Sequence, residues 1–259
     1  MLDATKLTVS ILDAAAVAAR ALTGYRVFDA MLGALAQVVP GRIPAAGEGG
    51  NTVFCMSGKD DANKPYIIVD MICGAWGARP DADGIEAITN ASQNLSNTPV
   101  EVLEAQHPVR VEAYELQPDS CGAGRYRGGL GIRRSYRALA DDVLLQLRAD
   151  RMKFRPYGLN GGGAASPAAN ILERAGEPPR HLPSKVNMTI ARGDVITHIQ
   201  PGGGGFGDPL ERDFQAIERD VWNQKVSPQY VQEHYRAVVD PVTGRIDRAA
   251  TEALRAAAG

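Results

Sequence analysis

The sequence predicts an α+β fold, in which a β-rich central domain, either a sandwich or a barrel-like sheet, is flanked by N-terminal and C-terminal helices. Three observations support this: helical apolar spacing before Pro40, short alternating segments between residues 51 and 199, and helical periodicity after Asp213. We divide the 259 residues into an N-terminal helical segment (1–40), a β-rich core (41–210) and a C-terminal helical segment (211–259).

The first forty residues have the composition and spacing of helices. Residues 14–22 are rich in alanine, and a second apolar series runs on until Pro40 ends it. We expect Gly24 and Tyr25 to separate two helices. Small residues at positions 33–36 suit close packing in a core or at an interface. The apolar positions of the second helix are Val27, Met31, Leu35 and Val38.

The middle of the chain consists of short β-type segments separated by turn residues. Residues 51–56 and 66–72 form the first pair, with the polar stretch 57–65 between them. Regular short strands of this kind favour a sandwich or barrel-like domain. The further predicted strands are residues 109–116, 132–139, 143–149, 170–174, 186–190 and 194–199.

Helix signals return near the C-terminus. One helix is expected from Asp213 to about Lys225, a second opens at Ser227-Pro228, and a last begins at Asp247.

Composition excludes several classes of partner. The formal net charge is −2 and aromatic residues make up 6%, which disfavours nucleic-acid binding. No apolar run approaches the roughly 18 residues that cross a bilayer, and the N-terminus lacks the features of a secretory signal. We expect no nucleic-acid or membrane partner, and a cytoplasmic location.

Cysteines and histidines give no metal or catalytic signature. Cys55, Cys73 and Cys121 form no CxxC pair, although Cys121 lies among glycines where exposure is possible. His107 and His181 are expected in surface turns, and the four histidines show no metal-ligand spacing. No Gly-x-Ser-x-Gly motif marks a nucleophile. We therefore assign no metal ligand, leave the catalytic residues unknown, and expect the isolated chain to be inactive.

Four glycine-rich stretches stand out, at residues 74–77, 122–131, 158–163 and 202–207. The last matches neither a phosphate-binding P-loop nor a dinucleotide fingerprint. Consecutive glycines let the backbone approach a ligand or another chain closely. Two interpretations stay open: a tight turn packed against another subunit, or a loop that cradles a ligand. The residues concerned are Gly202, Gly203, Gly204, Gly205 and Asp208. Valine at positions 203 and 204 is expected to impair assembly or activity and to leave the fold largely intact.

Three arginines are further candidates for ligand or subunit contact. Arg125 and Arg127 have strand-like spacing, so they could clamp a carboxylate or phosphate from one side. Alternatively they pair with nearby acids, namely Glu112, Glu115 or Asp119. Arg79 lies in the segment Gly77-Ala78-Arg79-Pro80 and is the third candidate.

The order of several motifs resembles a known family. Gly74-Ala75-Trp76-Gly77-Ala78-Arg79-Pro80 is followed by Asn94-Leu95-Ser96-Asn97-Thr98-Pro99, and then by Gly122-Ala123-Gly124-Arg125-Tyr126-Arg127-Gly128-Gly129-Leu130-Gly131. Leu182-Pro183-Ser184-Lys185 and the stretch 201–209 complete the series. From about Tyr25 onwards the chain resembles the C-terminal half of the B-type subunits of ATP-dependent hydantoinases, a family that includes parts of 5-oxoprolinases and of acetone and acetophenone carboxylases.

The resemblance implies a division of labour between chains. An A-type subunit would bind ATP with Mg²⁺ and phosphorylate the substrate's oxygen, which makes an amide carbonyl easier for water to attack. In the family, a divalent metal is held by the N-terminal half of the B-type subunit, which this sequence lacks. The implied partners are an A-type ATP-binding subunit, a chain carrying that N-terminal half, and a small-molecule substrate. The alternative is that this sequence is a fragment or a degenerate copy without activity of its own. No cofactor is expected on this chain alone.

Two functional hypotheses follow. In the first, the chain completes an ATP-dependent enzyme that hydrolyses cyclic amides (hydantoin, lactam or 5-oxoproline) or carboxylates ketones. In the second, it is a non-catalytic structural subunit that scaffolds such a complex. The sequence does not distinguish the substrates.

Overall fold

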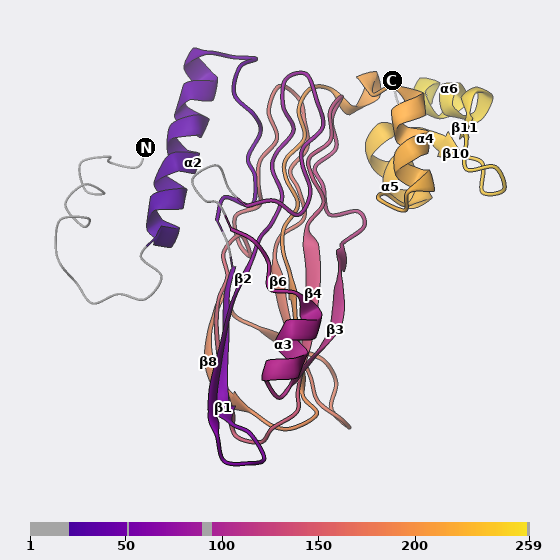
Figure 1. Cartoon of the computed structure of the whole chain (residues 1–259). Helices are drawn as coiled ribbons and strands as arrows, with labels where there is room; N and C mark the ends of the chain where they lie inside the picture. Colours follow the sequence, from indigo (N-terminus) through magenta and orange to yellow (C-terminus); the bar gives the residue numbers. More distant parts are fainter. Residues whose placement is uncertain (1–20, 51, 90–94, 258–259) are drawn as a thin grey trace.

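The computed structural model describes residues 21–50, 52–89 and 95–257 (Figure 1). Helix α2 (Ala21–Val38) opens this part of the chain, and the first predicted helix, residues 14–22, lies largely outside it. The expected break at Gly24 and Tyr25 is wrong, because α2 runs through both positions. A glycine inside a helix costs only about 1 kcal/mol, and the surrounding helix-forming residues offset that cost.

Two antiparallel sheets form the centre of the molecule. The first has the strand order β2-β1-β5-β8 and the second the order β3-β4-β9-β6-β7. Among the described residues no barrel closes, so the β-rich sandwich flanked by helices is the confirmed alternative. The strands of the first sheet are β1 (Thr52–Lys59), β2 (Pro65–Ile72), β5 (Val143–Arg148) and β8 (Lys185–Ile190). Those of the second are β3 (Val109–Leu116), β4 (Ile132–Ala138), β6 (Ala169–Glu173), β7 (Arg180–Leu182) and β9 (Val195–Ile199).

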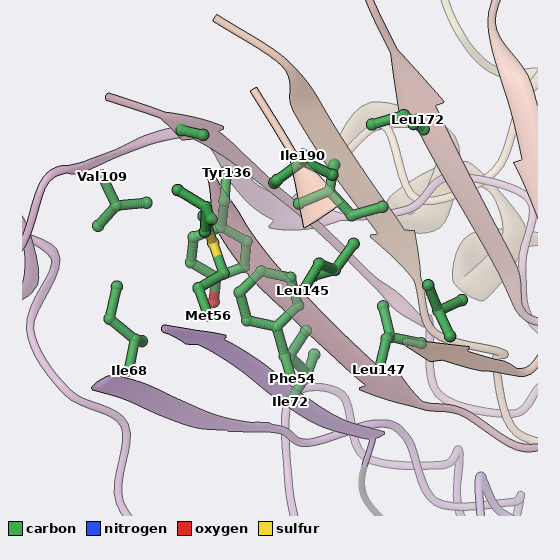
Figure 2. Close-up of a cluster of buried hydrophobic side chains, with 14 of the residues drawn as sticks. Phe54, Met56, Ile68, Ile72, Val109, Tyr136, Leu145, Leu147, Leu172 and Ile190 are labelled. Carbon is green, nitrogen blue, oxygen red and sulfur yellow. The ribbon is translucent and has the colours of Figure 1, made fainter. Parts of the chain in front are cut away.

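The core lies between the two sheets (Figure 2). Phe54 of β1 stacks on Tyr136 of β4, with ring centroids 4.3 Å apart, so the sheets are in direct contact. Leu145 of β5 and Ile196 of β9 are fully buried in the same cluster. Each such side chain contributes about 1.5–3 kcal/mol by leaving water. The alternating pattern of the strands therefore places one face of each sheet in a shared apolar interior.

The structure adds elements that the periodicity did not predict. Helix α3 (Val100–Gln106) has only two turns and contains β-branched residues, so it resembles a strand in sequence. Strand β7 is short, with Arg180 and His181 exposed and Leu182 buried, and its His181 pairs with Ile171 of β6. His181 is therefore not in a turn, as was predicted. His107 does lie at a junction, as the residue that ends α3.

The C-terminal helices begin where their capping residues predict. Asp213, Ser227 and Asp247 each accept a backbone N–H bond in the first turn that follows. The elements are η1 (Pro209–Glu211), α4 (Phe214–Trp222), α5 (Pro228–Tyr230), η2 (Val231–Tyr235), β10 (Val238–Val239), β11 (Ile246–Asp247) and α6 (Arg248–Ala256).

A second apolar cluster joins this segment to the centre of the chain. Ile217, Tyr230 and Val231 pack in one cluster with Leu130 and Cys121. Cys121 is thus 2% exposed rather than accessible, and burial raises the pKa of its thiol to about 11. The proposed domain boundaries at residues 40 and 210 stay a prediction.

In the described part of the chain, no helix has the length and apolar character that a bilayer crossing requires.

Candidate functional site

The four glycine-rich stretches meet beyond one end of the sandwich, with α2 on one side and the C-terminal helices on the other (Figure 1). Direct backbone bonds join them: Gly122 N–H donates to Gly203 O (2.7 Å), and Gly203 N–H donates to Gly129 O (2.8 Å). Gly205 N–H donates to Gly163 O (2.9 Å), and Gly129 N–H to Trp76 O (2.9 Å). We call residues 45–48, 74–78, 121–131, 157–165 and 200–207 the glycine bundle.

Glycine is required in this bundle because backbones touch. A Cβ atom on Gly203 would lie less than 3 Å from Trp76 O, and one on Gly204 less than 3 Å from Tyr157 O. Gly202 and Gly205 are equally close to Ser120 O and Ala123 O. All four glycines are buried. The predicted close approach therefore occurs between segments of one chain, and the expectation that valine at 203 and 204 leaves the fold intact is contradicted. Whether a ligand or another subunit also reaches this loop stays a prediction.

A cavity of about 250 Å³ separates α2 from the bundle. Phe28 and Leu32 of α2 line one side, and Trp76 lines the other. Two carboxyl groups, Asp29 and Glu48, add polarity to a mostly apolar wall. Such a site, apolar with a few polar groups, suits a small organic molecule. Neither carboxylate was predicted as a site residue. The feature of the sequence that could have pointed to this site is the position of Glu48, an acidic residue between Gly47 and Gly49.

Glu48 is the most perturbed acid at the cavity. It is 4% exposed, and its Oε2 accepts a bond from Gly50 N–H (3.0 Å). Burial raises the pKa of this carboxyl to about 8, although the positive charge of Arg26 opposes the shift. At neutral pH the group is therefore mostly protonated. A neutral carboxyl beside an apolar cavity can donate a hydrogen bond to a carbonyl oxygen or transfer a proton.

Asp29 is held by ion pairs. Arg151 Nη2 lies 2.9 Å from Asp29 Oδ2, and Arg26 Nη1 lies 3.4 Å from the same oxygen. Arg26 also pairs with Asp150, 2.9 Å away, just after β5. Burial raises the pKa of Asp29, and the two arginines offset part of that rise. These pairs fix α2 against the first sheet and leave Glu48 as the less compensated carboxyl.

A buried polar cluster extends from Glu48 into the sandwich. Gln200 Nε2 donates to Ile72 O (2.5 Å) and lies 3.5 Å from Glu48 Oε1. His198 Nδ1 is 2.6 Å from Asn170 Oδ1, and its Nε2 is 2.9 Å from the Thr52 hydroxyl. Since Asn170 Oδ1 can only accept, we assign the proton to Nδ1, so Nε2 is an acceptor. The single hydroxyl proton of Thr52 then has two acceptors within reach, His198 Nε2 and Gln200 Oε1 (3.2 Å).

Burial lowers the pKa of His198 to about 4, so its ring is neutral at pH 7. The cluster thus links β1, β6 and β9 by hydrogen bonds without adding a charge. His198 and Gln200 were not predicted as site residues, because only the fold brings them beside Thr52 and Glu48.

Arg127 lies in a buried network of charges. It is 3% exposed, with Nη1 2.8 Å from Glu86 Oε1 and Nε 3.0 Å from Asp220 Oδ2. Arg212 bridges Asp220 (2.6 Å) and Asp83 (2.7 Å). The network ties the bundle to α4. Because breaking a buried pair costs about 3–5 kcal/mol, its first role is structural.

Arg125 and Arg127 do not form the predicted clamp. Arg125 is exposed and its Nη1 lies 3.7 Å from Glu211 Oε2, whereas Arg127 is buried in other pairs. The alternative pairing with Glu112, Glu115 or Asp119 is also wrong. Those three acids contact Arg137, Arg133 and the backbone N–H of Ser227, respectively.

The remaining candidates lie at the edge of the bundle. Arg79 donates to Asp83 O (3.2 Å), and Asp208 caps η1 by accepting from Leu210 N–H (2.8 Å). Arg125 lines a second, polar cavity of about 490 Å³ together with Asp83 and Arg212. Ligand or subunit contact by Arg79, Arg125 and Asp208 stays a prediction.

Within residues 21–50, 52–89 and 95–257, no group of three or more histidine, cysteine, aspartate or glutamate side chains could hold a metal ion. The described residues therefore do not fit the divalent metal that the family resemblance implies.

Comparison with known proteins decides the family. The family described as Hydantoinase B/oxoprolinase matches residues 7–209. The chain belongs to this family. It is 34% identical over 207 residues to the B-type subunit of a putative D-/L-hydantoinase from a Pseudomonas species, and the match covers 78% of this chain. The family assignment made from the motifs is confirmed.

Two solved structures have the same fold. An ATP-dependent caprolactamase of Pseudomonas jessenii aligns with a TM-score of 0.74 and 28% identity over 86% of this chain. A nucleotide-free acetone carboxylase aligns with a TM-score of 0.73 and 19% identity over 83% of this chain. The chain spans only 34% of the putative hydantoinase polypeptide, 40% of the caprolactamase chain and 34% of the carboxylase chain.

Proposed function

We propose that this chain is part of a B-type subunit in a cytoplasmic, ATP-dependent complex that hydrolyses a cyclic amide such as a hydantoin, a lactam or 5-oxoproline. The family match over residues 7–209 carries the proposal. The 34% identity to a putative hydantoinase and the 28% identity to a caprolactamase favour cyclic amides. Acetone carboxylase, at 19% identity, supports the fold alone.

In this proposal, other polypeptides hold the cofactors. ATP with Mg²⁺ is bound by an A-type subunit, and the N-terminal part of a B-type subunit supplies the divalent metal. The sequence contains no P-loop, and the described residues form no metal cluster, so neither role is assigned to this chain. Its own contribution is the rigid glycine bundle and the cavity beside it.

The cavity gives this chain a part in substrate binding. Glu48 is mostly protonated at neutral pH and lines the cavity with Phe28 and Trp76. A neutral carboxyl can hydrogen-bond the carbonyl oxygen of an amide, and the apolar walls suit the methylene groups of a lactam ring.

The test is reconstitution. The purified chain is combined with the A-type subunit and with a polypeptide carrying the N-terminal part of a B-type subunit. ATP hydrolysis is then measured with hydantoin, caprolactam and 5-oxoproline. We expect ATP turnover that requires all three polypeptides and one of these amides. Turnover that is unchanged when this chain is left out would contradict the proposal.

The second candidate is a structural subunit without a part in catalysis. It is favoured by the buried polar groups of Arg127, Asp220 and His198, which pair within the chain. Leu32→Trp would fill the cavity and distinguishes the two roles. A structural subunit predicts unchanged turnover in the assembled complex, whereas a cavity that takes part in substrate binding predicts a raised KM for the amide. Ketone carboxylation is measured in the same complex with acetone and bicarbonate.

A further inference from the structure

Helix α2 exposes an apolar stripe beside the positions that line the cavity. Met31 is 57% exposed, Leu35 43% and Val38 75%. Their spacing of four and three residues places them on one face of the helix. The sequence predicts that these positions pack against something, in a core or at an interface. Within the described residues they do not.

The other contacts of α2 make this exposure unusual. Its opposite side is occupied, because Arg26 and Asp29 form ion pairs there, and the neighbouring positions Phe28 and Leu32 line the cavity. Yet among residues 24–38, for which burial is described, only Tyr25 is buried. Helices in globular proteins are stabilised mainly by burying an apolar face. A helix of 18 residues with so little burial is expected to have a further partner.

Most other exposed apolar residues in the described part of the chain are scattered, apart from short pairs on the edge strands β2 and β3. Trp222 (81%) and Val242 (91%) are widely separated in the chain, and isolated exposed residues of this kind are common. The outer face of edge strand β2 does add Ile67 (62%) and Val69 (61%). Figure 1 shows α2 and the sheet containing β2 on the same side of the molecule.

We propose that the stripe Met31, Leu35 and Val38 is the docking surface for the part of a B-type subunit that this chain lacks. The inference rests on the proposed function for the identity of that partner. This chain spans 34–40% of the related chains, so most of a B-type subunit lies outside it. A polypeptide of that size has the area to cover both the stripe and the outer face of β2.

The contact surface of the partner should be apolar rather than charged. The stripe contains no ionisable residue, and the charged residues of α2, Arg26 and Asp29, are engaged with Asp150 and Arg151. The partner should therefore present leucine, isoleucine or aromatic side chains, packed as one helix packs on another or on a sheet.

The test measures binding of the full chain to a polypeptide carrying the N-terminal part of a B-type subunit, by isothermal titration calorimetry. Met31→Glu/Leu35→Glu should weaken binding about 100-fold or more, because two central apolar contacts become buried charges. Leu35→Ala, which adds no charge, should weaken it about 10-fold. The matched control Val242→Glu should bind within about twofold of wild type, since single exposed positions outside an interface contribute little.

Two results would overturn the docking proposal. One is unchanged affinity in the double variant. The other is that the stripe mediates association of two copies of this chain, seen as a wild-type dimer in sedimentation equilibrium that Leu35→Ala dissociates without any effect on partner binding. Circular dichroism of each variant establishes that it is folded.

The docking and the proposed function fail in different ways. Stripe-dependent binding without amide-dependent ATP turnover would remove the function and leave the docking. Full turnover that the double variant does not reduce would remove the docking and leave the function.

Discussion

The sandwich and the glycine bundle are two interiors built by opposite means. In the sandwich, large side chains such as Phe54, Tyr136 and Leu145 fill the space between two sheets. In the bundle, extended segments lie so close that a single Cβ on Gly203 or Gly204 would meet a neighbouring carbonyl. The first interior is held by apolar burial and the second by direct backbone hydrogen bonds.

The two interiors should differ in the substitutions that they tolerate. A side-chain core can relax after a truncation, so the cost scales with the cavity left behind. Packed backbones cannot relax in this way, because moving one segment breaks the hydrogen bonds of its neighbours. We therefore expect the bundle to be sensitive to the smallest possible addition and the sandwich to large deletions.

The largest expected effect is that of Gly203→Ala. The added methyl group would lie less than 3 Å from Trp76 O, so at least two segments must separate. We expect a loss of more than about 4 kcal/mol in the free energy of unfolding, or no soluble protein. Urea denaturation followed by fluorescence measures it. A loss below about 1 kcal/mol would mean that the bundle is looser than its hydrogen bonds indicate.

Phe54→Ala examines the sandwich. Phe54 is fully buried and stacks on Tyr136, so its removal should cost about 3–5 kcal/mol. The matched control is Phe154→Ala, because Phe154 is 73% exposed and its loss should change the unfolding free energy by about 0.5 kcal/mol or less. Equal effects of the two variants in urea denaturation would argue against the sandwich core.

Glu48→Gln tests the buried carboxyl that lies where the glycine bundle meets the sandwich. Burial raises the pKa of the Glu48 carboxyl in the folded chain from 4.5 to about 8. The contribution of Glu48 to the stability of the wild type is therefore greatest below pH 4.5. That contribution is lost as pH rises towards 8, since the folded carboxyl must then ionise without solvent. The amide does not titrate. At pH 9 the variant should be more stable by on the order of 2–4 kcal/mol, at about 1.4 kcal/mol per pKa unit and after some relaxation.

Thermal unfolding between pH 5 and 9 measures this difference. Glu252→Gln, an exposed site on α6, is the control and should show the pH profile of the wild type. If Glu48→Gln also follows the wild-type profile, Glu48 is solvated and carries an ordinary charge.

The smallest expected effect is the stabilising change Gly24→Ala. It adds the same methyl group as Gly203→Ala, but at a helix position where nothing lies within 4 Å. Alanine should stabilise the chain by about 0.5–1 kcal/mol, through helix propensity and a less flexible unfolded state. A destabilised variant in urea denaturation would show that α2 is interrupted at this point, as the glycine in the sequence suggests.

Local features of this protein could be predicted from its sequence. Strand β3 was predicted at its observed bounds, and the helices that follow Asp213, Ser227 and Asp247 begin where their capping residues place them. These features depend on neighbours within a few residues, which any sequence displays. Family membership was also visible, since it depends on ordered motifs.

The tertiary structure alone decided which residues meet. Arg127 pairs with Asp220 and not with Glu112, although Glu112 is nearer in the sequence. Gln200 contacts Glu48, which lies far from it in the sequence. The four glycine stretches are far apart in the chain, yet each excludes side chains from the others. Sequence shows that a glycine or an arginine is present. Its partner is chosen by the way two sheets and a helix pack, because burial and contact are properties of the whole folded chain.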